Sequence, residues 1–230
     1  MNGSPHEPPG WWGKLSSLGD FASRRVTPEW VRACDDWLAR SIAISQQVLG
    51  ARWLEVYLGA PVWRFAWAPG VIDRDWWFGV LMPSCDNVGR YYPLVVVQRR
   101  ERPPIDRIGF DHLELWWMHV ARAAMQTLGE PSTLESFEAA LAQAPPWPSN
   151  GPVMVPQQRG VVAGRERFAI APGCSLGQLL HGLSVSELHG RNAGHSFWWP
   201  IGDGAREGSF SLGKGLPDAS SFAELLAGSW

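Results

Sequence analysis

Adjacent tryptophans constrain the fold of this chain more than any other feature of its sequence. Fifteen of its 230 residues are tryptophan, and four adjacent pairs occur: Trp11-Trp12, Trp76-Trp77, Trp116-Trp117 and Trp198-Trp199. Neighbouring residues of a strand point to opposite faces, so pairs that lie in strands require cover on both faces of their sheet. This favours a three-layer α/β/α sandwich, in which a mixed, largely antiparallel sheet is covered by helices on both faces.

The spacing of apolar, capping and turn residues predicts the order of elements. A helix should begin after the N-cap residue Thr27, with Pro28 in its first turn, and end at Gly50. Ser132 and Glu135 predict a capping box for a later helix. The buried stripe of the first helix should consist of Trp30, Cys34, Trp37, Ile44 and Val48. Further helices are expected at 51–58, 111–128, 133–142, 175–183 and 220–227, and strands within 11–25 and 61–70 and at 76–82, 91–99, 166–171, 195–200 and 208–212.

Bulk composition excludes several classes of protein. Apolar residues make up 45% of the chain, charged residues 18%, and the net charge is −2, which is typical of a globular protein without a nucleic-acid or anionic-membrane footprint. The three cysteines are far apart in the sequence, which suggests neither a disulfide framework nor a zinc site. The N-terminus lacks the pattern of a signal peptide, and no run approaches the ~18 apolar residues of a membrane span. We therefore expect a soluble, cytoplasmic protein without membrane insertion, metal or cofactor.

A proline-rich stretch is the main irregularity in the organisation of the chain. Five prolines between 145 and 156 argue against a helix or a central strand there. The stretch could divide two domains or form a surface excursion within one. We expect a flexible tail over 1–10 and a single domain over 11–230, with the proline-rich excursion at 144–160.

Two glycine-rich motifs are similar to catalytic signatures but lack the partners that the chemistry needs. "GSFSLGKG" (208–215) has the spacing of a P-loop, but Gly215 stands where a Ser or Thr would bind magnesium, and no helix follows it. "GCSLG" (173–177) fits a nucleophile elbow, but the acid and histidine that should follow Ser175 are too close in sequence for a hydrolase sheet. We interpret Ser175 as a helix N-cap. The six histidines show no metal-ligand spacing.

The stretch "PSCDNVGR" (83–90) interrupts two apolar runs and forms the predicted loop of a hairpin. Asp86 is suited to accept hydrogen bonds from amides of the turn, and Gly89 to adopt positive φ. No histidine or second carboxylate lies nearby in sequence, so general acid–base chemistry is not indicated. Its eight residues are long for a hairpin tip, and long loops often bind partners. We call residues 83–90 the island loop.

Four segments of the sequence together resemble the TagF family, also called ImpM, of accessory proteins of the bacterial type VI secretion system. The segments are "GWWGKLSSLGDFASRR" (Gly10–Arg25), "YLGAPVWRFAW" (Tyr57–Trp67), "WFGVLMPSCDNVGRYYPL" (Trp77–Leu94), and "HSFWWPIG" together with "GLPDASSFAELL" near the C-terminus. The resemblance covers most of the chain from residue 10 onward. It implies an α/β/α sandwich, in agreement with the inference from the tryptophan pairs.

The resemblance also implies regulation without catalysis. Proteins of this family are regarded as post-translational repressors of type VI secretion that act on a cytoplasmic scaffold with a forkhead-associated domain. The first and third segments carry charged residues that a core does not require. We expect these side chains to form one partner-binding surface, where the N-terminal segment meets the island loop: Lys14, Asp20, Arg24, Asp86 and Arg90.

Two alternatives remain open at the level of sequence. The chain could be a small serine or cysteine hydrolase that uses Ser175 or Cys85, although the family usually has an aliphatic residue at the position of Cys85. It could also be a structural component of the secretion complex. In addition, the charged residues Asp20, Asp86 and Arg90 could serve only to hold turns together.

Overall fold

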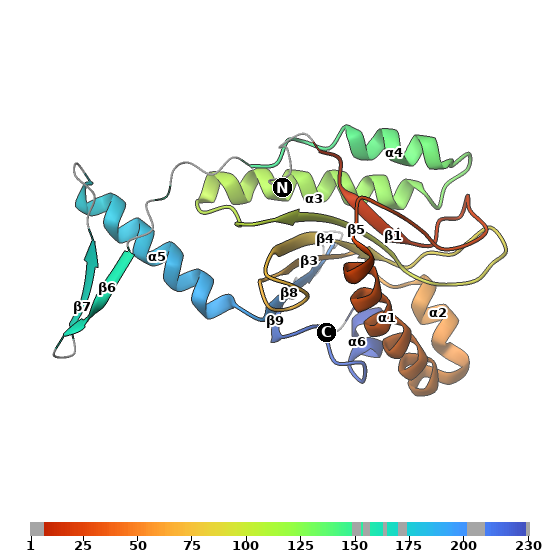
Figure 1. The fold of residues 1–230 in the computed structure, drawn as a ribbon. Helices are drawn as coiled ribbons and strands as arrows, with labels where there is room; N and C mark the ends of the chain where they lie inside the picture. Colours follow the sequence, from red (N-terminus) through yellow and green to blue (C-terminus); the bar gives the residue numbers. More distant parts are fainter. Residues whose placement is uncertain are drawn as a thin grey trace.

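In the computed structural model, the core of the chain is one seven-stranded sheet with the strand order β2-β1-β5-β4-β3-β8-β9 (Figure 1). The structure describes residues 7–148, 153, 157–162, 165–169, 174–201 and 210–228. All six strand pairs of this sheet are antiparallel. The sequence predicts a mixed, largely antiparallel sheet, and the described strands form a fully antiparallel one. The strands are β1 (Gly10–Gly13), β2 (Ala22–Arg24), β3 (Trp63–Trp67), β4 (Trp76–Met82), β5 (Leu94–Arg100), β8 (His195–Pro200) and β9 (Ser211–Lys214).

Helices cover both faces of this sheet, which confirms the predicted sandwich. One face carries α3 (Arg107–Gln126) and α4 (Leu134–Ala142). The other carries α1 (Pro28–Leu49), α2 (Trp53–Leu58) and α6 (Phe222–Leu226), with a short 3₁₀ helix, Gly50–Arg52, between the first two.

The tryptophan pairs in strands divide between the two layers of core as expected. Trp76 packs in the core under α3, and Trp77 packs in the core under α1. Trp11 and Trp12 divide in the same way. Both members of the pair Trp116-Trp117 lie in α3 and face the same core. The pairs within strands therefore carry the signal for two-sided cover.

The capping residues of the first helix were predicted correctly, but its buried stripe was predicted wrongly in its second half. Thr27 caps α1, and Gly50 ends it with a positive φ of 52°. Ile44 is only half-buried and Val48 is 62% exposed. The buried residues of α1 are Trp30, Cys34, Trp37, Leu38, Ser41, Ile42 and Ser45. Ser41 and Ser45 thus belong to the buried stripe in place of Ile44 and Val48. The hydroxyl of Ser45 accepts a hydrogen bond from the indole N–H of Trp53 in α2 at 2.9 Å.

Several element boundaries also differ from those predicted. The capping box of α4 is formed by Thr133 and Ser136, one residue beyond the predicted Ser132 and Glu135. The predicted helix at 175–183 continues to Asn192 as α5 (Leu176–Asn192). As expected from Pro93, β5 begins only at Leu94.

The C-terminal half contains a hairpin separate from the main sheet. Strands β6 (Gln157–Val162) and β7 (Arg165–Ala169) pair with each other only, and β6 was not predicted. In Figure 1, α5 projects away from the sheet, and the two strands lie at its far end. The predicted excursion at 144–160 includes the start of β6, while its residues 149–152 and 154–156 lie outside the described residues. Residues 1–6 of the predicted tail and 208–209 of the predicted last strand also lie outside them.

None of the helices in the described ranges is both long enough and apolar enough to cross a membrane.

Candidate functional site

Two loops meet at one end of the sheet. Residues 14–21, the N-terminal loop, connect β1 to β2. The island loop, which in the structure extends over residues 83–93, connects β4 to β5. Gly13 and Met82 both pair with Leu94, so the two loops start side by side. Gly13 has a φ of +136°, and a Cβ atom there would lie 2.2 Å from the carbonyl oxygen of Pro93. Only glycine permits this close approach of β1 to the island loop.

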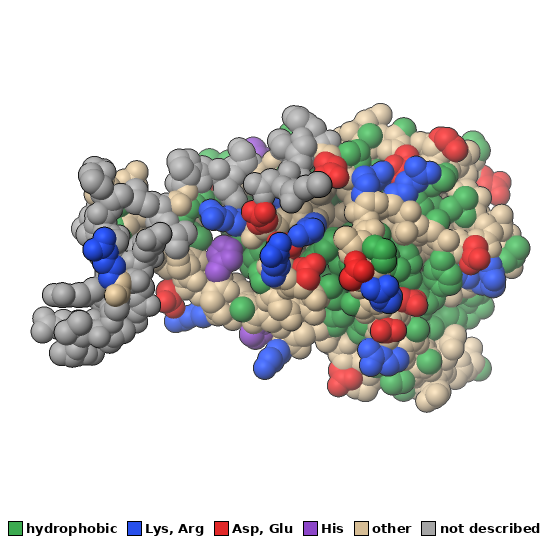
Figure 2. Space-filling view, viewed as in Figure 1, with side chains coloured by type: hydrophobic (Ala, Val, Ile, Leu, Met, Phe, Trp, Pro, Cys, Tyr) green, Lys and Arg blue, Asp and Glu red, His purple; other side chains and the backbone are tan. Residues whose placement is uncertain are grey.

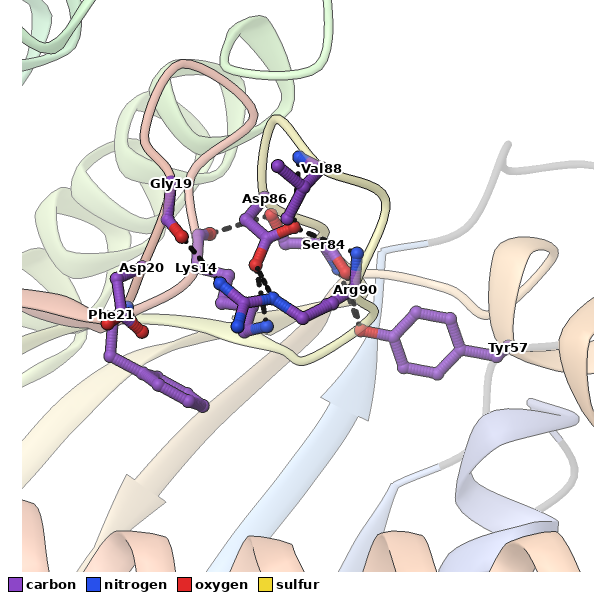
Figure 3. Close-up of polar contacts among 9 residues, drawn as sticks. All are labelled: Lys14, Gly19, Asp20, Phe21, Tyr57, Ser84, Asp86, Val88 and Arg90. Carbon is purple, nitrogen blue, oxygen red and sulfur yellow. Dashed lines mark hydrogen bonds and ion pairs between the residues drawn. The ribbon is translucent and has the colours of Figure 1, made fainter.

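A buried ion pair joins the two loops (Figure 3). The ammonium of Lys14 lies 2.8 Å from Oδ2 of Asp86, and the two side chains are 6% and 0% exposed. The backbone amide of Asn87 also donates to the carbonyl oxygen of Leu18, at 2.9 Å. Because a charge buried without a partner is strongly destabilising, each loop depends on the other for its stable position.

Asp86 also organises the island loop from within. Its Oδ1 accepts hydrogen bonds from the amides of Val88 at 3.2 Å and Arg90 at 2.8 Å, and its Oδ2 accepts one from Nε of Arg90 at 2.7 Å. Gly89 takes a positive φ of 81°. The roles predicted for Asp86 and Gly89 in the turn are thus confirmed.

The environment of Asp86 keeps its carboxylate ionised. Burial alone would raise the pKa of this carboxyl. The hydrogen bonds from Lys14, from the Arg90 amide and from the Arg90 guanidinium outweigh burial and hold the pKa well below its usual range. A carboxylate with so low a pKa is a poor proton acceptor, so the site is unsuited to general-base chemistry through Asp86.

Two residues that were not singled out in the sequence anchor the island loop to the sandwich. The hydroxyl of Tyr57 donates to the carbonyl oxygen of Ser84 and accepts from the Ser84 amide, both at 2.9 Å. The Ser84 hydroxyl donates to the carbonyl oxygen of Lys14 at 2.8 Å. Burial raises the pKa of the Tyr57 hydroxyl above its ordinary value. Tyr57 begins the second segment that resembles the TagF family, which was the available signal for it.

An aromatic group lies beside the ion pair. The ring of Phe21 stacks on Trp12 with centroids 5.9 Å apart and meets Tyr92 edge-on at 4.8 Å. The ammonium of Lys14 lies 5.0 Å from the Phe21 ring centroid. Tyr92 donates from its hydroxyl to Oδ1 of Asp35 in α1, at 2.7 Å. Phe21 remains 44% exposed, so it adds an apolar contact area to the outside of the two loops.

The five predicted site residues do not share one position. Lys14 and Asp86 were expected at the surface, but both are buried. Their ion pair lies under the two loops and holds them together. Arg90 lies above them, with its side chain 56% exposed, and donates from Nη2 to the carbonyl oxygen of Gly19. Asp20 is exposed in the N-terminal loop, where its Oδ1 accepts from the Phe21 amide. Arg24 lies apart in β2, with its Nε 3.7 Å from a carboxylate oxygen of Glu138 in α4.

The outer surface of the two loops is mixed in character. Its exposed residues include Asp20, Phe21 and Arg90, and Val88 is 66% exposed at the tip of the island loop. Figure 2 shows apolar side chains between the region of β1 and that of α1, with acidic and basic side chains interspersed around them. We call the surface formed by Asp20, Phe21, Val88 and Arg90 the two-loop surface.

The other motifs form no catalytic set in the part of the chain that the structure describes. The hydroxyl of Ser175 accepts a hydrogen bond from the amide of Gln178 and caps α5, as predicted. Gly208 of the P-loop-like motif and Gly173 of the elbow motif lie outside the described residues. Among those described, no cluster of three or more His, Cys, Asp or Glu residues is arranged to hold a metal ion.

Comparisons with known proteins identify a family and include a solved structure of similar fold. The family model for the "TagF N-terminal domain, Type VI secretion system-associated" matches residues 10–144. The crystal structure of PA0076 from Pseudomonas aeruginosa PAO1 superposes with a TM-score of 0.70 and is 32% identical in sequence. This match covers 96% of the present chain and 94% of that one. No curated protein matches the sequence.

Proposed function

Because this chain belongs to the TagF family of type VI secretion system-associated proteins, we propose that it is a non-enzymatic regulator that represses secretion after translation. It does so by binding a scaffold protein with a forkhead-associated domain. The family match covers residues 10–144, which include both loops of the two-loop surface.

The observation that carries this proposal is the buried ion pair of Lys14 and Asp86 beneath the two loops. It ties together segments 72 residues apart in sequence, with both charges removed from solvent. Such a pair does not favour stability over a well-packed apolar contact, but it specifies one arrangement of the groups around it. A surface held in one arrangement loses little conformational entropy when it binds, which favours affinity for a partner.

The composition of the two-loop surface supports a protein partner. Protein interfaces combine an apolar or aromatic centre with a polar rim, and arginine and aromatic residues are enriched in them. Phe21 and Val88 provide exposed apolar groups, and Asp20 and Arg90 provide charges of both signs beside them. The low pKa of the Asp86 carboxyl and the raised pKa of the Tyr57 hydroxyl also favour a binding role over a catalytic one.

The experiment that tests the proposal is affinity purification of the tagged protein from cells with active type VI secretion, followed by mass spectrometry. The proposal predicts recovery of the scaffold with the forkhead-associated domain. Recovery of sheath or baseplate proteins without that scaffold would instead make the chain a structural component. Recovery of no secretion protein would contradict both and leave the hydrolase alternative, which predicts fast labelling of Ser175 by a fluorophosphonate or of Cys85 by iodoacetamide.

A further inference from the structure

Helix α3 carries a second apolar stripe on the side that faces away from the sheet. Its inner side packs on the sheet, with Trp116 and Trp117 in the core (Figure 1). Its outer side has four large apolar side chains that are between 42% and 68% exposed: Ile108, Leu115, Met118 and Met125. The outer side of a surface helix is normally polar, because apolar area exposed to water is unfavourable. An apolar face of this kind is typical of an interaction site.

The spacing along this outer face is that of a coiled-coil seam. Two charged residues complete the row, and its six members follow one another in alternating steps of three and four: Ile108, Asp111, Leu115, Met118, Arg122 and Met125. All six are exposed. This alternation is the heptad pattern by which two helices pack side by side. We call these six residues the α3 seam.

The α3 seam is complementary to a second copy of itself that runs in the opposite direction. When two seams are paired about their common centre, Asp111 of one copy lies opposite Arg122 of the other, and the two-fold symmetry repeats this contact. The same register joins the remaining residues as apolar couples: Ile108 with Met125, and Leu115 with Met118. Each layer of the pair therefore contains either two apolar side chains or two opposite charges.

Other arrangements of two α3 seams are less favourable. In a parallel pair each residue meets its own copy, so like charges would face each other at Asp111 and at Arg122. An antiparallel pair shifted by one heptad in either direction would place one of these charges opposite an apolar side chain and the other beyond the end of the second helix. Charge pairing thus specifies one orientation and one register, as polar residues in coiled-coil seams do.

We propose that the chain forms a symmetric homodimer through antiparallel pairing of the α3 seams of two copies. The seam extends over nearly the whole of the 20-residue helix. One helix from each copy makes a smaller contact than the interfaces of permanent dimers, so we expect a dissociation constant of about 1–100 µM. The seam shares no residue with the two-loop surface, and the proposal does not rest on the scaffold as partner.

Sedimentation velocity of the full chain, at concentrations from about 1 to about 200 µM, tests whether the dimer forms. We expect a concentration-dependent change from monomer to dimer. Leu115→Glu in the α3 seam should weaken association at least about tenfold, and Leu58→Glu in α2 should leave it unchanged, although both leucines are 60% exposed. A monomer at every concentration would overturn the proposal and leave the seam to a different protein. A dimer that Leu115→Glu leaves intact would overturn it as well.

Charge reversals test the register of the pair. Asp111→Arg and Arg122→Asp each oppose like charges in their own homodimer, so each variant should associate at least about tenfold more weakly than the unmodified protein. An equal mixture of the two variants restores both opposite-charge contacts, and a heterodimer should form with about the affinity of the unmodified dimer. Circular dichroism verifies that each variant is folded. Folded variants that dimerise as well as the unmodified protein, or a mixture that does not associate, would overturn the proposed pairing.

Discussion

Lys14 and Asp86 show why the charged residues of this site were selected from the sequence but misplaced. Both stand in segments whose charged residues a core does not require, which is why the sequence indicates a site there. Their burial depends on the pairing of β1 with β5, which brings together residues 72 positions apart. The local sequence of neither segment predicts that strand pairing. Arg24 was misplaced for a related reason, since β2 directs it toward Glu138 of α4, far along the chain.

Replacement of Lys14 by methionine should destabilise the fold strongly. The variant keeps a long side chain but leaves the buried Asp86 carboxylate without its ammonium partner. We expect the free energy of unfolding to fall by about 3–5 kcal/mol, measured by urea denaturation. Lys214 is the other lysine of the chain and is exposed, so Lys214→Met should change stability by no more than about 0.5 kcal/mol. Similar small losses in both variants would show that the ion pair does not hold the loops.

The pH dependence of stability should report the Asp86 carboxylate. Its pKa is lower in the folded protein than in the unfolded chain, so the unfolded chain takes up its proton first as the pH falls. The stabilisation is therefore fully present above the unfolded pKa, about 4, and is lost as the pH falls through the folded pKa. Comparison with Asp86→Asn isolates this effect from the other carboxylates.

We expect the difference in unfolding free energy between the unmodified protein and Asp86→Asn to be constant from about pH 7 to 5 and to shrink below about pH 4. The measurement is a series of urea denaturations across that range. A difference that stays constant to the lowest pH would mean that the pKa of Asp86 is the same in the folded and unfolded chain.

At the scale of elements, the two faces of β4 were predicted more accurately than the buried face of α1. Alternation in β4 is complete, because Trp76, Phe78, Val80 and Met82 enter one core and Trp77 and Leu81 enter the other. The second half of α1 was predicted wrongly because its buried positions include Ser41 and Ser45, which a search for apolar spacing passes over. Ser45 is accommodated there because Trp53 approaches closely and donates to its hydroxyl.

Two glycines with different surroundings should respond in opposite ways to substitution by alanine. Gly13→Ala places a Cβ against the Pro93 carbonyl in a backbone region that side chains disfavour, and should destabilise by about 1–3 kcal/mol or more. Gly190→Ala in α5 meets open space and should raise helical stability by about 0.5–1 kcal/mol. Thermal unfolding followed by circular dichroism measures both. A Gly13→Ala variant as stable as the unmodified protein would contradict the close approach.

The cap of α5 provides a local test of the role of Ser175. Ser175→Ala removes the acceptor for the Gln178 amide and should weaken the first turn by about 1 kcal/mol, while Ser175→Asp should preserve the cap. The readout is hydrogen exchange of the Gln178 amide, expected about fivefold faster in the alanine variant alone. Equal exchange in both variants would show that the hydroxyl does not act as the cap.

At the scale of the whole molecule, the sandwich was predictable, but the projecting C-terminal part was not. Paired tryptophans in strands require two covered faces whatever the details of the loops. The length of α5 and the presence of β6 could not be deduced in the same way, because glycines at 177, 182 and 190 obscure the helical pattern and prolines precede the hairpin. An apolar cavity between α3, α5 and the sheet likewise combines residues from β3, β4, α3, α5 and β8 with residues from two loops, and no single sequence motif predicts it.

The most direct test of the central claim is the affinity of the purified protein for the purified forkhead-associated scaffold, measured by calorimetry with two valine variants. Val88 is 66% exposed on the two-loop surface, and Val48 is 62% exposed at the end of α1. Neither valine side chain takes part in the buried ion pair. We predict that Val88→Asp weakens binding at least about tenfold, and that Val48→Asp leaves it unchanged. Equal affinities of both variants and the unmodified protein would contradict the assignment of the two-loop surface as the docking site.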